Sequence, residues 1–511
     1  MAELATPDGA LVKGMGRTLV YGFAAHFTVA LVNVLATPFL LRLLGEEAYG
    51  LVAFFSMLQA WVLLFDFGVS PALARQLSHY RVGALSADEA ARLFAAAEII
   101  FVGVGLVAGA ALMLSAPWVG AHWLRRASLS AVELNGSLRL IAVLLVCRWL
   151  CGLYQAALVG LERQTQSNCV LAASVVVRYA VAVATLQLAS PHPTTFFAIQ
   201  AAFTLAEAIT CRLLLIRALP LKPAGASPGW RLLAAERRFA LGLALAAAAA
   251  TLIGQVDKLA LSHALSLPAY GLFGLVAQVT AGVGLVVPPF VQVFQPRLTG
   301  LLAQGRRAEF VHVYRAAAAL ILSLAAALAG TIAAQPAWVI WAWTGRADAA
   351  ARLAPVLTLY ASGAAIAAFL FAPFLLQYAQ GRVRLHVIGN VGFAVVWAPA
   401  AVWAAFTIGP IGTGAVWLCG NLLYLIAWAP LIHARLLSPE ERRGLNLSLW
   451  VRGAILAGLL AATRLLPVGP LSRLEALAAL GVISLTIGLI GVALSSDARA
   501  FVRHGFGEAA P

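Results

Sequence analysis

Long apolar segments alternate with short polar ones along almost the whole chain. Backbone groups in hydrocarbon must form their hydrogen bonds internally, so apolar segments of about 20 residues predict helices that cross a bilayer core about 30 Å thick. The alternating polarity of a transmembrane β-barrel is absent. We therefore expect an all-α polytopic membrane protein with fourteen spans, near residues 18–40, 49–74, 93–116, 138–160, 168–189, 195–217, 239–263, 269–295, 314–340, 353–379, 384–407, 411–434, 449–466 and 474–495.

One tetrapeptide occurs twice at the start of an apolar segment. The sequence Ala-Tyr-Gly-Leu stands at residues 48–51 and again at 269–272. Because the two predicted helices are an even number of spans apart, they cross in the same direction, which indicates a parallel repeat. The expected domains are a six-helix lobe over 1–217, a linker at 218–238, a second six-helix lobe over 239–436, and two further helices with a tail over 437–511.

Two polar segments carry the signature of a helix start. Ser86 precedes Glu89 by three residues, and Ser438 precedes Glu441 by the same spacing. A serine hydroxyl and a carboxylate at this spacing can each satisfy a free amide of the first helical turn, which is the capping-box pattern. We expect a helix to begin after each serine.

Basic residues set the expected orientation. With the N-terminus in the cytoplasm, 24 of the 35 Lys and Arg residues fall on the cytoplasmic side, eight on the opposite side and the rest within spans. This bias is the positive-inside pattern and predicts that both termini are cytoplasmic. It also accounts for most of the net charge of +15, so nucleic-acid binding is not expected. Because 62% of the residues are hydrophobic and only 11% are charged, we expect the protein to contact membrane lipids.

Several charged residues lie inside the predicted spans, where hydropathy disfavours them. An Arg, Lys or Asp at the centre of a membrane helix costs about 2.5–3.5 kcal/mol, so such a group normally faces a wet cavity or an opposite charge. Arg148 and Arg178 lie close to the middle of their spans, so exposure of their side chains to lipid tails is not expected. The charged residues inside the predicted spans are Asp66, Arg148, Arg178, Glu207, Asp257 and Lys258.

Two interpretations of these charges stay open. In the structural one, Arg148 or Arg178 pairs with Glu207 and holds the first lobe together. In the functional one, the cations line a cavity that receives an anionic headgroup. Asp257 and Lys258 are consecutive, so their side chains leave a helix about 100° apart and are expected to find separate partners.

Other polar residues of the spans are assigned to structure first. For Asp66 and Glu98 we favour structural pairing over a role in a cavity. His26 lies in the first span; a proton carrier is one interpretation, and a hydrogen-bonded core histidine is the favoured one. The sequence has no phosphate-binding loop, no His-Glu-x-x-His and no Gly-x-Ser-x-Gly, so we expect no enzyme activity, no cofactor and no metal site.

Three segments resemble a known family. They are Pro-Phe-Leu-Leu-Arg-Leu-Leu-Gly-Glu-Glu-Ala-Tyr-Gly-Leu at 38–51, Asp-Phe-Gly-Val-Ser-Pro-Ala-Leu at 66–73, and Asp-Lys-Leu-Ala-Leu at 257–261. The first two resemble the N-terminal signature of polysaccharide-export flippases, in the multidrug/oligosaccharidyl-lipid/polysaccharide (MOP) exporter superfamily. The third resembles that family's aspartate followed by a basic residue and an aliphatic run, so only Asp257 and Lys258 are matched by position.

The resemblance implies a pair of six-helix lobes that opens alternately to either side of the bacterial cytoplasmic membrane. It implies a substrate made of an oligosaccharide on undecaprenyl diphosphate, moved to the periplasmic leaflet for lipopolysaccharide O-antigen or exopolysaccharide synthesis. Other polysaccharide-assembly proteins would be partners. Members with two additional C-terminal helices include lipid II flippases, so the glycan stays open.

A specific hypothesis joins the burial argument to the resemblance. Arg148, Arg178 and Lys258 would make charge-assisted contacts with the diphosphate, while the prenyl tail stays in lipid. The main alternative is a multidrug exporter of the same superfamily, coupled to a proton or sodium ion that binds Asp66, Glu207 or Asp257. A membrane-embedded glycosyltransferase would need large outer loops, which the sequence lacks.

Overall fold

The computed structural model describes residues 9–189, 191–219, 229–382, 384–465 and 471–504. These residues are helical apart from connecting turns and one isolated bridge between Arg125 and Ser266. They pack as two compact units: unit 1 is Met1–Thr251 with Leu265–Gly271, and unit 2 is Leu252–Ala264 with Leu272–Pro511. The all-α fold class is confirmed. Of the predicted linker at 218–238, residues 220–228 lie outside the described residues.

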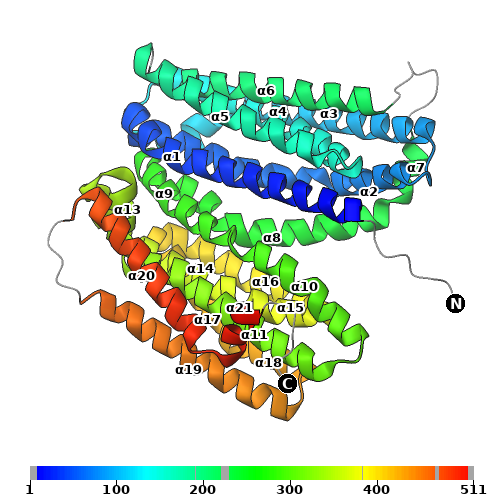
Figure 1. Ribbon diagram of the computed structural model, residues 1–511. Helices are drawn as coiled ribbons and strands as arrows, with labels where there is room; N and C mark the ends of the chain where they lie inside the picture. The colour runs from blue at the N-terminus through cyan, green and yellow to red at the C-terminus, as the bar shows by residue number, and fades with distance from the viewer. Residues whose placement is uncertain (1–8, 190, 220–228, 383, 466–470, 505–511) are drawn as a thin grey trace. The chain divides into compact units, whose positions relative to one another are not determined.

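Unit 1 contains the first helices of the chain, drawn from blue to green in Figure 1. Their core is built where α4 packs against α6, α3 and α2, and where α1 packs against α5. Trp149 of α4 stacks on Phe101 of α3 with ring centroids 4.3 Å apart. The elements are α1 (Gly9–Val62), η1 (Leu63–Asp66), α2 (Val69–Arg81), α3 (Ala87–Trp118), η2 (Val119–Trp123), α4 (Ala131–Gly160), α5 (Gln164–Leu188), α6 (Pro193–Ala218) and α7 (Trp230–Ala235).

Two helices contribute to both units, and the remaining helices belong to unit 2. The shared helices are α8 (Arg237–Ala264) and α9 (Leu267–Gly284). The helices of unit 2 are α10 (Val287–Ala303), α11 (Arg307–Ala325), η3 (Ala326–Gly330), α12 (Thr331–Ala334), α13 (Pro336–Thr344), α14 (Ala347–Phe369), α15 (Phe371–Ala379), α16 (Arg384–Thr407), α17 (Pro410–Leu423), η4 (Tyr424–Trp428), α18 (Ala429–Leu436), α19 (Pro439–Thr463), α20 (Arg473–Ala493) and α21 (Ser496–His504).

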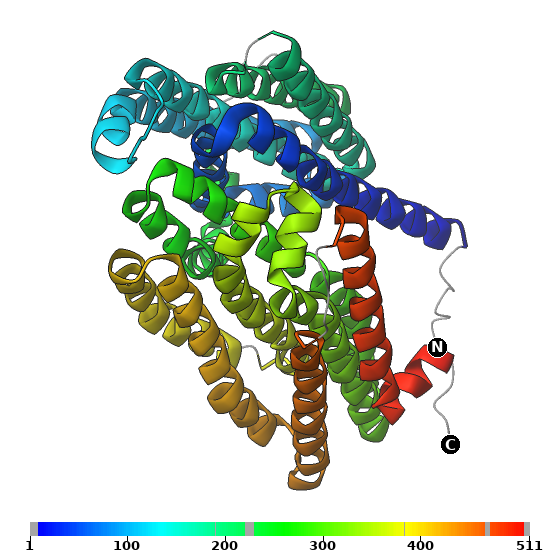
Figure 2. The same cartoon turned by 90° about the vertical axis from the view of Figure 1, so that its left-hand side faces the viewer.

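The last two long helices pack on unit 2. Helix α20 contacts α11 and α13, and α19 contacts α11 and α20, as the orange and red ribbons in Figure 2 show. An ion pair fastens α19, because Arg307 Nη2 of α11 lies 2.8 Å from Glu441 Oε2. The two additional helices predicted from the sequence are thus part of this unit's packing.

Twelve of the described helices are long and apolar enough to cross a membrane, and they cover thirteen of the fourteen predicted spans. The first two predicted spans fall within one candidate, Ala24–Asp66, in which the non-helical backbone of Gly45 separates two helical segments of α1; its φ of 81° suits glycine. The remaining predicted span, 239–263, coincides with α8, which is not among the twelve.

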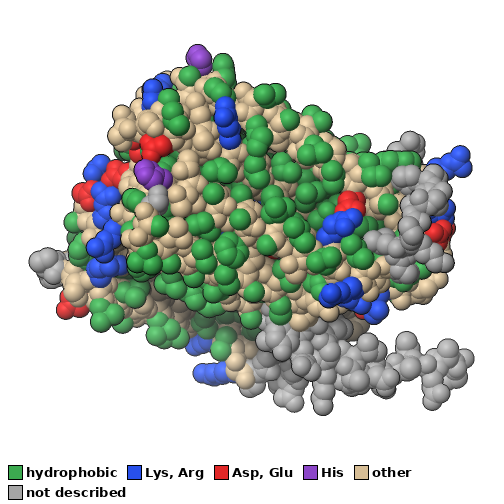
Figure 3. Space-filling model, turned by 90° about the horizontal axis from the view of Figure 1, so that it is seen from above, with side chains coloured by type: hydrophobic (Ala, Val, Ile, Leu, Met, Phe, Trp, Pro, Cys, Tyr) green, Lys and Arg blue, Asp and Glu red, His purple; other side chains and the backbone are tan. Residues whose placement is uncertain are grey.

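The surface of the protein has the polarity of a membrane-embedded chain. The face in Figure 3 is covered by hydrophobic side chains in its middle, and charged side chains gather toward its two ends. In unit 1 the exposed apolar residues include Leu106 and Val107 of α3, Val177 of α5, and Ile209 and Leu213 of α6. Exposed apolar surface on this scale needs a lipid environment.

Capping boxes begin four of the helices. Both predicted boxes are confirmed, since Ser86 begins α3 with Glu89 and Ser438 begins α19 with Glu441. Two further boxes were not predicted, at Ser130 before α4 and Ser472 before α20. Each box satisfies two backbone amides that a helix start leaves free.

The repeated tetrapeptides meet in unit 1. A Cβ atom added to Gly50 would overlap the carbonyl oxygen of Leu267, and one added to Gly271 would overlap the carbonyl oxygen of Glu46. Helix α1 and the start of α9 therefore approach backbone to backbone at these glycines. Small residues permit this kind of close helix packing in membranes.

Glu47 anchors the loop that leads into α4. Its buried carboxylate accepts hydrogen bonds from the amides of Ala127, Ser128 and Leu129 and from the Ser128 hydroxyl, at 2.5–3.0 Å. The same loop accepts a hydrogen bond at Arg125 O from the amide of Leu267, at 2.8 Å. One carboxylate thus fixes the loop beside the start of α9.

Replacing Glu47 with alanine is expected to lower the free energy of unfolding by about 2–3 kcal/mol, because hydrogen bonds to a charged group are lost and three amides are left without their acceptor. Chemical denaturation of the detergent-solubilised protein measures this change. Asp88→Ala is the control, because the Asp88 side chain is 66% exposed in its pair with Arg92 and should cost less than about 1 kcal/mol. Equal losses for the two variants would contradict this assignment.

Candidate functional site

Three charged side chains from α4, α5 and α6 meet at one buried point of unit 1. Arg148 Nη1 donates to Glu207 Oε1 at 3.3 Å, and Arg178 Nη1 lies 3.6 Å from Glu207 Oε2. The Glu207 side chain is fully buried, while those of Arg178 and Arg148 are 9% and 21% exposed. In one of the two interpretations left open by the sequence, Glu207 pairs with one of these arginines, and the structure pairs it with both.

This cluster holds more positive than negative charge, since two guanidinium groups share one carboxylate. A neutral donor also uses one acceptor position of that carboxylate, because Gln155 Nε2 donates a hydrogen bond to Glu207 Oε1 at 3.0 Å. Arg178 Nη1 also donates to Thr204 Oγ1 at 3.3 Å, and Arg178 Nε has no hydrogen-bond partner among the described residues. A surplus buried cation with an unused donor is suited to an anionic oxygen.

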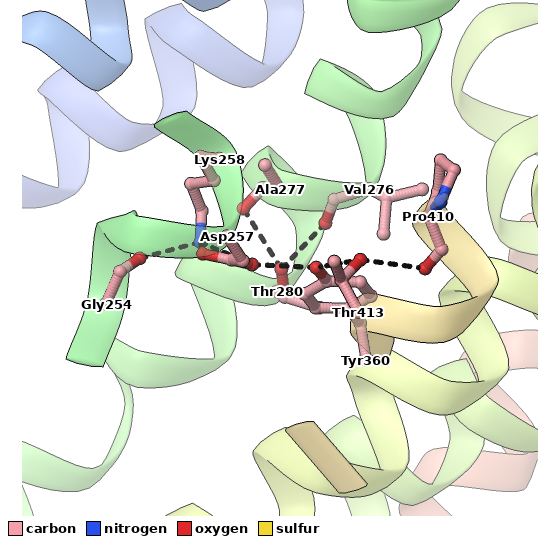
Figure 4. A network of polar contacts seen from close by, with 9 residues as sticks. All are labelled: Gly254, Asp257, Lys258, Val276, Ala277, Thr280, Tyr360, Pro410 and Thr413. Carbon is pink, nitrogen blue, oxygen red and sulfur yellow. Dashed lines mark hydrogen bonds and ion pairs between the residues drawn. The ribbon is translucent and has the colours of Figure 1, made fainter. Parts of the chain in front are cut away.

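The second charged group lies in unit 2 around Asp257 (Figure 4). Lys258 Nζ lies 3.2 Å from Asp257 Oδ1 and donates to the carbonyl of Gly254 at 2.7 Å. The hydroxyl of Tyr360 donates to Asp257 Oδ2 at 2.7 Å and lies 3.0 Å from Thr413 Oγ1. Asp257 is 2% exposed, and the ammonium group of Lys258 and the hydroxyl of Tyr360 contact its buried carboxylate.

The expectation that Asp257 and Lys258 find separate partners is wrong. The angle between neighbouring Cα–Cβ bonds on a helix fixes the direction of the first bond only. The four-carbon stem of a lysine is flexible and can bring its ammonium group back toward a neighbour. Here Lys258 bends along α8 and pairs with Asp257 while also binding the preceding turn.

The other charged residues singled out in the sequence have local roles or lie at the surface. Asp66 Oδ1 accepts from the amide of Ser70 at 2.8 Å and so supports the first turn of α2. Glu98 pairs with Arg212 at 2.6 Å, in the structural role that we favoured. His26 is exposed on α1, so the favoured prediction of a buried core histidine is wrong.

Sequence reasoning missed the neutral members of both clusters. Gln155 follows Arg148 by seven residues on α4, and Thr204 precedes Glu207 by three on α6. These spacings place each pair on one helix face, so periodicity could have found them. No local signal connected Tyr360 to Asp257, because α14 and α8 are far apart in sequence.

Together these features define a class of protein. Twelve of the described helices are apolar and long enough to cross a bilayer, which makes this a multi-pass membrane protein, and the buried Arg178 and Glu207 lie on two of them. The sequence profile of the family described as "Polysaccharide biosynthesis protein" matches residues 16–301, which is more than half of the chain. The chain belongs to this family. No match was found among curated protein sequences.

Solved structures show the same fold. The lipid II flippase MurJ in an inward closed conformation is 12% identical with a TM-score of 0.67, covering 95% of this chain and 100% of MurJ. An inward-facing multidrug resistance MATE family transporter of the MOP superfamily is 12% identical with a TM-score of 0.60, covering 80% of this chain and 94% of the transporter. The chain therefore belongs to the polysaccharide biosynthesis family and shares its fold with these two transporters.

Proposed function

We propose that the protein flips an oligosaccharide linked to undecaprenyl diphosphate from the cytoplasmic to the outer leaflet of the bacterial cytoplasmic membrane. Alternating access would move the headgroup, and the product would serve surface polysaccharide assembly by partner proteins. Membership of the polysaccharide biosynthesis family supports the glycan, and the MOP fold supports a transport mechanism. The basic bias of the sequence supports cytoplasmic termini.

The observation that most supports this proposal is the excess of positive charge in the buried cluster, where Arg148 and Arg178 share the single carboxylate of Glu207. A diphosphate with a hydrophilic glycan cannot cross hydrocarbon unaided, because its charges would lose their hydration. A buried guanidinium with an unused donor offers a replacement for part of that hydration. The prenyl tail needs no such shelter and can stay in lipid during the transfer.

The alternative is a multidrug exporter coupled to a proton or sodium ion, which needs a membrane carboxylate to bind that ion. The three carboxylates that the sequence offered for this role all have partners. Glu207 is shared by two arginines, Asp257 is paired with Lys258, and Asp66 binds the start of α2. This pairing favours an anionic cargo over a cationic one.

The test removes each cation in cells that lack their own flippase. Arg148→Ala and Arg178→Ala are each expected to lower surface glycan about tenfold or more, because a charge-assisted contact contributes about 1.5–3 kcal/mol. Lys258→Ala is expected to have a similar effect if the ammonium group shifts from Asp257 to the diphosphate. Surface glycan is quantified on immunoblots, with protein level measured in the same membranes.

Arg75→Ala is the matched control, because the Arg75 side chain is 49% exposed and pairs with Glu236 away from the buried cluster. It should leave surface glycan unchanged. Undiminished glycan in the triple variant that lacks all three cations would end the proposal. Arg178→Lys should retain part of the activity, because it keeps the charge and loses the planar fork of donors.

A further inference from the structure

Unit 2 contains an uncharged cavity of about 280 Å³, lined mainly by side chains of α14, α15, α16, α17 and η4. Five aromatic side chains line it, and three of them lie at steep angles to one another. The ring of Phe393 lies 6.5 Å from that of Trp417 at 81° and 6.1 Å from that of Tyr424 at 77°. The cavity thus presents ring faces and edges from three different elements, α16, α17 and η4.

Amide side chains share the same lining. Gln377 is 1% exposed, and its Oε1 has no hydrogen-bond partner in the part of the chain that the structure describes. Asn421 donates from Nδ2 to the Trp417 carbonyl at 2.8 Å, and Asn390 Nδ2 lies 2.9 Å from His386 Nε2. A buried acceptor without a donor costs free energy, so Gln377 calls for an explanation in terms of a ligand or a water.

The lining carries no Lys, Arg, Asp or Glu among the residues described. An anionic diphosphate is therefore a poor ligand here, and a plain hydrocarbon chain would leave Gln377 Oε1 without a donor. The ligand that satisfies both halves of the lining has an apolar face for the rings and hydroxyls for the amides. A neutral sugar ring has this chemistry, and the volume lies just below the range of about 300–1,000 Å³ typical of drug-sized ligands.

We infer that this cavity, defined by Phe393, Trp417, Tyr424, Gln377 and Asn421, binds one neutral sugar ring of the substrate headgroup. A C–H face of the ring packs on the aromatic side chains, and a hydroxyl donates to Gln377 Oε1. The inference rests on the proposed function, because it assigns the glycan of that substrate to a site separate from the arginines that would contact the diphosphate.

The experiment measures binding to the full-length protein in lipid nanodiscs with two kinds of probe. One probe is farnesyl diphosphate, and the other is a panel of farnesyl diphosphates that carry glucose, galactose or N-acetylglucosamine. The wild-type protein should bind at least one of the sugar probes about tenfold more tightly than farnesyl diphosphate, as one further well-placed polar contact predicts.

Two variants probe the two halves of the lining. Gln377→Leu removes the unpartnered oxygen together with one hydrogen bond of 3.2 Å from Gln377 Nε2 to the Pro373 carbonyl, so it should change the melting temperature little, yet it should abolish the tenfold preference for the sugar probe. Trp417→Leu should have the same effect on the preference. Trp403→Leu is the matched control, because Trp403 lies on α16 outside the cavity and is 61% exposed. Farnesyl diphosphate should bind all three variants as it binds the wild type.

The outcomes separate this inference from the proposed function. Equal affinity of wild type for farnesyl diphosphate and for every sugar probe would overturn the sugar site while leaving the diphosphate site in place. A sugar preference that survives both Gln377→Leu and Trp417→Leu would also overturn it, because the sugar would then bind elsewhere. Failure of all probes to bind the wild type would overturn the proposed function together with the inference.

Discussion

Replacing Glu207 with alanine is expected to destabilise the protein by about 3–5 kcal/mol, because removal of one partner from a buried ion pair leaves an uncompensated charge behind. Here two guanidinium groups, those of Arg148 and Arg178, would lose their shared carboxylate. The expected result is a fall in the yield of folded protein and a lower midpoint in chemical denaturation. The measurement uses detergent-solubilised protein under identical lipid conditions.

A second carboxylate on the neighbouring helix gives the matched control. Glu98 pairs with Arg212, but the Arg212 side chain is 45% exposed, so Glu98→Ala should cost less than Glu207→Ala. The double variant Arg178→Met and Glu207→Met should recover part of the stability, because it replaces the more buried ion pair by apolar residues and leaves only Arg148, whose side chain is 21% exposed, without its carboxylate. If this double variant folds and still transports glycan at the wild-type rate, Arg178 is a structural residue and not a substrate contact.

Gly271→Ala is expected to destabilise the protein by about 3 kcal/mol, because the added Cβ would overlap the carbonyl oxygen of Glu46 and lie 2.9 Å from the amide nitrogen of Gly50. Both obstacles are backbone atoms, which cannot move aside as a flexible side chain can. Helices α1 and α9 would have to separate. Chemical denaturation and the rate of thermal inactivation in detergent report this loss.

Gly282 supplies the control on the same helix. A Cβ added there meets no heavy atom within 4 Å, so Gly282→Ala should be neutral or should stabilise α9 by up to about 1 kcal/mol through helix propensity. The difference in stability between the two variants measures the steric cost at the contact between α9 and α1, separately from the general effect of alanine on a helix. Equal effects would show that the contact between Gly271 and α1 carries no strain.

Hydrophobic patterning predicted most of the fold because a membrane leaves helices as the only economical solution for the backbone. It could not predict how helices join, since continuity across a junction depends on a single backbone angle. At the first predicted loop, the non-helical backbone of Gly45 divides α1 into two helical segments without any intervening loop. Phe67 and Gly68, both with positive φ, end the second predicted span early, and α2 follows them.

The candidate site was predicted in part, and the reason is again physical. Burial cost marks Arg148, Arg178 and Glu207 in the sequence because each is a charge within an apolar segment. Neutral partners such as Gln155 and Tyr360 carry no comparable penalty and give no such signal. Side-chain flexibility was the other limit, since Lys258 reaches Asp257 by bending and not by helical spacing.

The meeting of the two Ala-Tyr-Gly-Leu segments has a consequence for how such a chain can change over time. Gly50 faces the carbonyl oxygen of Leu267, just before the second segment, and Gly271 faces the carbonyl oxygen of Glu46 and the backbone of Gly50. A bulkier residue at position 50 therefore cannot be offset by a smaller one at position 271, which is already glycine. A substitution in one copy of the tetrapeptide therefore cannot be compensated by a substitution in the other. If the two halves of the chain arose by duplication, the Ala-Tyr-Gly-Leu segment should stay identical between them after most other positions have diverged.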